Sequence, residues 1–178
     1  MRYASPGPPV RASTFNAVRR LFVIVAAALL VACSSGGGGK AGQPLDATFK
    51  RFDGTTGTLA EYRGKPVLVN FFSSTCIPCQ TEMPALEQVH RALGDQVTFL
   101  GMDVQDTVDG GKAFVDTVGI TWELGRDPDA AILQGAIGGV GLPTTVVLDR
   151  KGSVVFSHLG PLDVAGLTKT LRDNKLIS

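Results

Sequence analysis

Residues that bind metal ions are scarce in this chain. Its 178 residues include three cysteines, Cys33, Cys76 and Cys79, and two histidines, His90 and His158. A structural zinc site normally takes four nitrogen or sulfur ligands, and the chain has no second Cys-x-x-Cys segment to supply them. The two histidines lie far apart in the sequence, so a packed or surface position is the simpler interpretation of each. We therefore expect no zinc site and no cofactor.

Long apolar segments are also lacking. The apolar run at residues 21–32 has 12 residues, whereas a helix that crosses a bilayer needs about 20. Four arginines precede this run and small residues end it, which is the layout of a secretory signal peptide. The segment Leu30-Val31-Ala32-Cys33 resembles the lipobox of bacterial lipoproteins. We predict that residues 1–32 are a signal peptide and that Cys33 becomes the lipidated first residue; the alternative is an ordinary signal peptide with an incidental cysteine.

The chain has no strong excess of charge. Of its 17 Lys and Arg residues, the four leader arginines precede the apolar run, which leaves 13 basic against 16 acidic residues and a net charge of −3. This balance gives no reason to expect nucleic-acid binding. Residues 33–42 would comprise the lipidated cysteine and a Gly/Ser tether, flexible and on the order of 15 to 20 Å long. We expect an extracytoplasmic protein, exported by the general secretory route and anchored to the bacterial cell membrane.

The distinctive segment is Cys76-Ile77-Pro78-Cys79. Residues 67–72 are nearly all apolar and predict a buried strand, and the cysteines follow where this strand gives way to a helix. At a helix N-terminus, unpaired N–H groups and the helix dipole favour the thiolate of Cys76 over its thiol. Cys79 lies one turn later on the same face, so the pair can alternate between dithiol and disulfide. A purely structural disulfide over so short a loop would stabilise little, which favours redox chemistry.

Three motifs resemble those of the TlpA/ResA/DsbE-like branch of the thioredoxin superfamily. They are Gly-Lys-Pro-Val-Leu-Val-Asn-Phe-Phe at 64–72, Cys-x-Pro-Cys-x-x-Glu-x-Pro at 76–84 and Gly-Leu-Pro-Thr-Thr at 141–145. The resemblance covers residues 43–178. It implies an α/β thioredoxin fold with a mixed central sheet, helices on both faces and an N-terminal β-hairpin addition. In one departure, the family usually has Trp before the first cysteine, where this chain has Thr75.

The resemblance also implies a place where substrate binds. Pro143 would be a cis-proline beside the cysteines, and the backbone of the preceding residue would pair with an extended substrate. The alternative is a trans-proline that merely ends the glycine-rich loop. We expect four residues to form the substrate-binding surface: Thr75, Ile77, Pro78 and Leu142.

Glu82 is the candidate base for the second cysteine. It lies three residues after Cys79 on the same helical face and matches the acidic residue that the family carries after its Cys-x-x-Cys. The buried acid that cytoplasmic thioredoxins carry six residues before the first cysteine is replaced here by Asn70, which cannot titrate. The alternative is a carboxylate that only favours the positive end of the helix.

The remaining pattern alternates strands and helices, which implies parallel pairing through crossovers. The expected elements are a first hairpin arm at 47–52, a helical turn at 58–62, helices at 76–93, 111–118, 129–134 and 163–174, and strands at 67–72, 97–104, 144–148 and 153–158.

These observations predict a membrane-tethered thiol-disulfide oxidoreductase with Cys76 and Cys79 as its catalytic pair. The resemblance implies a reducing role, typically on the haem-attachment cysteines of apocytochrome c, with electrons from a membrane protein of the CcdA/DsbD kind. One alternative is an oxidase that introduces disulfides into secreted proteins. Another is a copper-binding and delivery module that uses the two sulfurs and His158 as ligands.

Overall fold

The structure of the protein is a computed structural model, and it describes residues 44–178. The expected signal peptide, the lipidation site Cys33 and the Gly/Ser tether lie outside these residues. No helix in the described part of the chain is long and apolar enough to cross a membrane.

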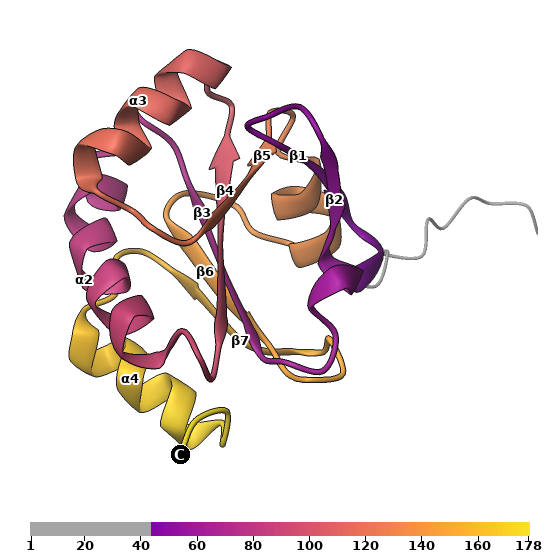
Figure 1. The fold of residues 1–178 in the computed structure, drawn as a ribbon, viewed down its shortest axis with the longest axis vertical. Helices are drawn as coiled ribbons and strands as arrows, with labels where there is room; N and C mark the ends of the chain where they lie inside the picture. Colours follow the sequence, from indigo (N-terminus) through magenta and orange to yellow (C-terminus); the bar gives the residue numbers. More distant parts are fainter. Residues whose placement is uncertain (1–43) are drawn as a thin grey trace, which may run out of the picture. The chain divides into compact units, whose positions relative to one another are not determined.

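A seven-stranded sheet runs through the described residues (Figure 1). Its strand order is β2-β1-β5-β4-β3-β6-β7, with β3 paired in parallel to β4, β4 in parallel to β5, and the other neighbours antiparallel. The strands are β1 (Thr48–Arg51), β2 (Thr56–Thr58), β3 (Val67–Phe72), β4 (Thr98–Val104), β5 (Glu123–Asp127), β6 (Thr144–Leu148) and β7 (Val154–Leu159). The mixed sheet of a thioredoxin fold is therefore present, and the β1–β2 hairpin is added at the edge beside β5.

β3 lies inside the sheet because its side chains have apolar partners on both faces. All six of its residues are buried. Leu68 and Phe72 point into one core, whereas Val67, Val69 and Phe71 point into the other. Side chains alternate between the two faces of a strand, so Asn70 shares the face of Leu68 and Phe72.

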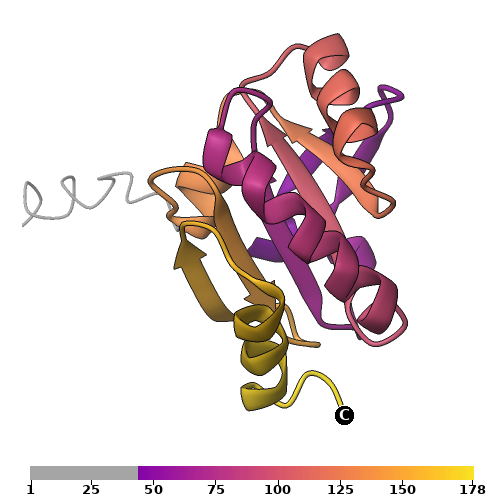
Figure 2. The same ribbon diagram turned by 90° about the vertical axis from the view of Figure 1, so that its left-hand side faces the viewer.

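The three α-helices pack against one face of the sheet and short helical segments cover the other. Met83 and Leu86 of α2, Phe114 of α3 and Leu167 of α4 belong to the core on the first face. Figure 2 shows α2 and α4 in front of the strands. The helices are α2 (Ile77–Leu93), α3 (Val108–Val118) and α4 (Val164–Asp173), and the short segments are η1 (Pro44–Asp46), η2 (Leu59–Tyr62) and η3 (Ile132–Ile137). Helices on both faces are thus confirmed.

One expected element takes another form in the structure, and one strand of the structure was not expected. The predicted helix at 129–134 is instead the π-helix η3, which begins at Ile132 because the Asp127 carboxylate accepts the N–H groups of Ile132 and Leu133. The sequence reasoning also missed β5, whose polar residues do not show a strand pattern. Tertiary packing forms this strand: the ring of Phe49 lies so close to Gly125 that a Cβ there would meet it at 2.4 Å.

Helix α3 begins earlier than expected. The predicted start was Gly111, but the helix begins at Val108, because the Thr107 side chain caps it by accepting the N–H of Gly110 at 3.1 Å. Gly119 ends it in the left-handed conformation, with φ of 71°.

Candidate active site

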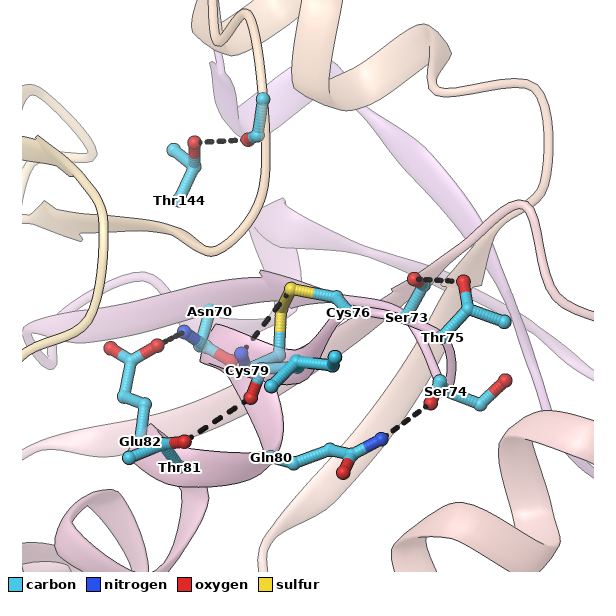
Figure 3. Close-up of a disulfide and its surroundings, with 12 residues drawn as sticks. Asn70, Ser73, Ser74, Thr75, Cys76, Cys79, Gln80, Thr81, Glu82 and Thr144 are labelled. Atoms are coloured by element: carbon cyan, nitrogen blue, oxygen red, sulfur yellow. Dashed lines mark hydrogen bonds between the residues drawn. A yellow bond between two sulfur atoms is a disulfide. The ribbon is translucent and has the colours of Figure 1, made fainter.

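The Cys76–Cys79 disulfide lies at the N-terminus of α2, directly after the turn that follows β3 (Figure 3). Cys76 is the N-cap residue, and its Sγ accepts the backbone N–H of Cys79 at 3.2 Å. Pro78 stands in the first turn, where its missing N–H costs no hydrogen bond. The first cysteine is therefore placed where N–H groups and the helix dipole stabilise negative charge on sulfur.

The two sulfurs differ in access to solvent. Cys76 is half-buried, whereas Cys79 has no exposed surface. The residues beside Cys76 are open: Thr75 and Pro78 are exposed, and Ile77 is 73% exposed. The structure thus leaves an approach to the first cysteine and shields the second, as the sequence reasoning expected.

The Leu142–Pro143 peptide bond is cis, as the resemblance implied. Thr144 pairs with Phe71, so Pro143 lies at the end of β3 that leads to the cysteines. Pro143 is buried and its carbonyl accepts the N–H of Gly160 at 2.9 Å. Within residues 44–178 the backbone N–H and C=O of Leu142 take no part in a hydrogen bond. These groups are available to an incoming strand.

Glu82 is buried beneath the cysteines rather than exposed on the helix. Its side chain is 2% exposed, and it accepts hydrogen bonds from Asn70 Nδ2 at 3.4 Å, Thr145 Oγ1 at 3.2 Å and the Leu162 N–H at 3.4 Å. Burial is the main influence and raises the pKa of Glu82 to about 7, against the lowering effect of these three donors. The residue also stands beyond the first turn of α2, where the helix dipole has little effect.

A second acidic group supports the turn before Cys76, and the sequence reasoning missed it. Asp106 accepts hydrogen bonds from the backbone N–H of Ser74 and from its hydroxyl, the latter at 2.9 Å. Arg126 in turn donates to the Asp106 carbonyl at 2.8 Å. Asp106 follows the end of β4, which pairs with β3, so its place after a buried strand was the available signal.

Asp103 lies behind this group, at the end of β4 and opposite Phe72. It is 1% exposed, and neither carboxylate oxygen accepts a hydrogen bond from the described residues. Burial and the neighbouring Asp106 carboxylate raise the pKa of Asp103 to about 7, against the lowering effect of Arg126, whose Nε lies 3.7 Å from Oδ2. Gly111 is required here, since a Cβ would meet Asp103 Oδ2 at 2.2 Å.

The histidines and the single tryptophan lie in packed positions. His90 contacts the rings of Phe99 and Trp122 edge-on, with centroids 5.2 and 5.6 Å away, and Trp122 is buried. His158 stacks on Phe156 at 6.1 Å. Among residues 44–178, no three His, Cys, Asp or Glu side chains gather in a way that could hold a metal ion, so the copper hypothesis gains no support here.

This geometry agrees with what comparison with known proteins finds. The sequence model of the AhpC/TSA family matches residues 41–157. The chain belongs to the AhpC/TSA family. This assignment and the structure confirm the resemblance to thioredoxin-like thiol-disulfide oxidoreductases that the motifs indicated.

Individual relatives include a thioredoxin-like protein and a thiol-disulfide oxidoreductase. The chain is 29% identical over 123 residues to the thioredoxin-like protein YneN of Bacillus subtilis, covering 67% of this chain and 71% of YneN. It is 32% identical over 111 residues to the thiol-disulfide oxidoreductase ResA of Geobacillus thermodenitrificans, covering 61% of this chain and 63% of ResA. The solved structure of MTB DsbF superposes with a TM-score of 0.69 at 25% identity, covering 76% of this chain and 98% of DsbF. The protein is a thioredoxin-like thiol-disulfide oxidoreductase.

Proposed function

We propose that the protein exchanges disulfides with other proteins through a two-step reaction at Cys76 and Cys79. The Cys76 thiolate attacks a substrate disulfide and releases one substrate thiolate. The Cys79 thiolate then attacks Cys76 Sγ, forms the intramolecular disulfide and releases the second substrate thiolate. The two electrons that reduce the substrate disulfide come from the dithiol pair, and the reverse sequence oxidises a substrate dithiol.

The unequal exposure of the two sulfurs carries this proposal. An approachable Cys76 at the helix N-terminus suits the attacking role, and a fully buried Cys79 suits the resolving role, because substrate sulfur reaches only the first. The free backbone groups of Leu142 offer a pairing edge, and the exposed Thr75, Ile77 and Pro78 surround the attack site.

Glu82 is the group that supports the second step. A shielded thiol in apolar surroundings loses its proton reluctantly. A carboxyl group whose pKa is about 7, one turn along the helix from Cys79, suits a general base that accepts this proton near neutral pH. We propose that Glu82 takes the proton from Cys79 Sγ, directly or through one water.

Cysteine variants test the assignment of the two roles. Cys79→Ser should accumulate mixed disulfides with protein substrates, because the attacking thiol remains and the resolving thiol is gone. Cys76→Ser, the matched control, should accumulate none. Non-reducing gels of material trapped from cells would show the difference, and the opposite pattern would overturn the assignment.

We propose that the physiological direction is reduction of protein disulfides such as those of apocytochrome c, with electrons from a membrane donor of the CcdA/DsbD kind. The resemblance of the three motifs to the TlpA/ResA/DsbE-like branch supports this direction. An oxidase that introduces disulfides into secreted proteins is the second candidate. The reduction potential separates them: a value near about −270 mV, as in thioredoxin, supports the reductase, and one near about −120 mV, as in DsbA, supports the oxidase.

We also propose that the domain works outside the cytoplasm, tethered through Cys33. The support is the lipobox-like segment Leu30-Val31-Ala32-Cys33 and the glycine-rich residues that follow. Cys33→Ala should release the protein from membranes and leave the potential of the soluble domain unchanged, because a flexible tether decouples the two ends. A variant that stays in the membrane fraction after a high-salt wash would contradict the tether.

A further inference from the structure

A cavity of about 450 Å³ lies next to Glu82 on the face of the sheet that α2 covers. Helix α2 forms one wall through Thr81, Glu82 and Ala85. The other wall consists of His158 on β7 and residues 161–163, which lead into α4. The cavity therefore adjoins the buried carboxyl group that the proposed function uses.

Glu82 both accepts buried hydrogen bonds and lines the cavity. Its oxygens accept hydrogen bonds from Asn70 on β3, Thr145 on β6 and the Leu162 N–H. Asn70 and Thr145 are fully buried. Glu82 itself is only 2% exposed, and it is one of the residues that line the cavity.

Strand pairing places His158 next to Thr145, a hydrogen-bond partner of Glu82. Thr145 and His158 are paired residues of β6 and β7, so their side chains lie on the same face of the sheet. Thr145 uses that position to donate to Glu82 Oε1, and the half-buried imidazole of His158 lines the cavity next to it. Phe156 stacks on the imidazole and limits its movement on one side.

Few ionisable groups border this space. Asp163, the other one on the far wall, accepts the Gly166 N–H at 2.6 Å as the N-cap of α4. The imidazole of His158, which stacks on Phe156, makes no side-chain hydrogen bond within the described residues, and histidine is a common proton shuttle in proteins. Glu82 is the titratable residue that lines the cavity on the α2 side.

We infer that His158 carries protons between Glu82 and the solvent through this cavity. The inference rests on the proposed function, because it assumes that Glu82 accepts the proton of Cys79. In the resolving step the Cys79 proton moves to Glu82, the new sulfur–sulfur bond to Cys76 forms, and the departing substrate thiolate takes a proton from solvent. The proton on Glu82 passes to His158 and out to solvent as the sulfur–sulfur bond forms, so the loss of this relay should slow the resolving step itself. His158 acts through Glu82 rather than on the sulfurs.

The decisive experiment compares His158→Gln with His90→Gln in full-length protein. His90 is the matched control, since it is the only other histidine and packs against Phe99 and Trp122 instead. Resolution of a preformed mixed disulfide with a disulfide-containing peptide is followed by stopped flow at low buffer concentration. Circular dichroism verifies that both variants are folded.

We expect His158→Gln to slow resolution about tenfold at pH 7 and His90→Gln to leave it unchanged. Added imidazole should restore the His158→Gln rate, because the cavity is open to small molecules. The defect should shrink as pH rises and Cys79 ionises unaided. Wild-type rates in His158→Gln, or a defect that neither imidazole nor high pH relieves, would overturn the relay.

Glu82→Gln, measured in parallel, separates this inference from the proposed function. If Glu82→Gln slows resolution and His158→Gln does not, only the relay is wrong. If Glu82→Gln leaves resolution unchanged, the proposed base is wrong and the relay falls with it. With both roles correct, the double variant should be no slower than Glu82→Gln alone, because the two groups act in series.

Discussion

Glu82 and Asp103 are two buried acids on either side of the turn that leads into Cys76, and burial raises the pKa of each to about 7. Their surroundings differ. Glu82 accepts hydrogen bonds from Asn70, Thr145 and the Leu162 N–H and borders an open cavity. Asp103 accepts none from the described residues.

This comparison shows that a raised pKa alone does not identify a general base. Three donors stabilise the ionised form of Glu82, and the residue lines a cavity, which suits a group whose protonation changes during turnover. Asp103 has only Arg126 at 3.7 Å as a counter-charge, with the Asp106 carboxylate opposing it, and Gly111 packs against its oxygens. We therefore assign proton transfer to Glu82 and support of the turn to the Asp103–Asp106 group.

The largest expected effect is on the resolving step. Glu82→Gln should slow it on the order of 10³-fold near pH 7, because the proposed general base is lost, while attack by Cys76 is preserved. Asp103→Asn, which removes an acid of similar pKa without touching the proposed proton path, should change it less than about twofold. Stopped-flow measurement of both steps tests this pair. Equal defects in the two variants would erase the distinction between the acids.

The sequence predicted the frame of this site but not the difference between the acids. Residues 67–72 and the helix that ends before Gly94 could be read directly, because an apolar run and a helix stop are local signals. The burial of Glu82 could not be predicted from the sequence, since its hydrogen-bond partner Thr145 is 63 residues away in the chain. The support that Asp106 gives to the turn could not be predicted either, because only the pairing of β4 with β3 brings Asp106 to Ser74.

The second effect concerns stability as a function of pH. The folded protein holds the Asp103 proton up to a pKa of about 7, whereas the unfolded chain releases it near 3.8. Between these pH values the folded state binds more protons, so stability falls as pH rises through this window, and below it the effect is absent. Asp103→Asn should remove on the order of 4 kcal/mol of this fall in the free energy of unfolding.

Urea unfolding at about pH 4 and about pH 8 measures that change. The variant and the wild type should differ little at the lower pH, and the variant should be the more stable protein at the higher one. Glu82→Gln should flatten the curve less, because the ordinary pKa of Glu82 is 4.5 and its shift is smaller. Parallel pH curves for wild type and Asp103→Asn would contradict the assigned cause.

A third change should make the Glu82 site resemble the Asp103 site. Asn70→Asp removes the amide that donates to Glu82 and Thr145 and places a second carboxylate beside Glu82. The like charge should raise the pKa of Glu82 by about one more unit, and the pH at which resolution reaches half its maximum should rise with it. Asn70→Ala is the control, since it loses the donor without adding charge and should shift the profile less. A profile shifted equally by both would show that only the lost hydrogen bond matters.

The smallest effect tests the other acid group. Asp106→Ala removes both hydrogen bonds to Ser74 and should cost about 1 to 2 kcal/mol of stability, whereas Asp116→Ala, on the exposed side of α3, should cost little. The same change also removes the carboxylate that raises the pKa of Asp103. Removing the Asp106 carboxylate also removes its repulsion of an ionised Asp103, and this stabilises the variant only where Asp103 is ionised. The loss in stability should therefore be greater at about pH 5 than at about pH 8. Urea unfolding at both values measures it, and a loss that is equal at the two pH values would show that Asp106 acts on Ser74 alone and leaves Asp103 unaffected.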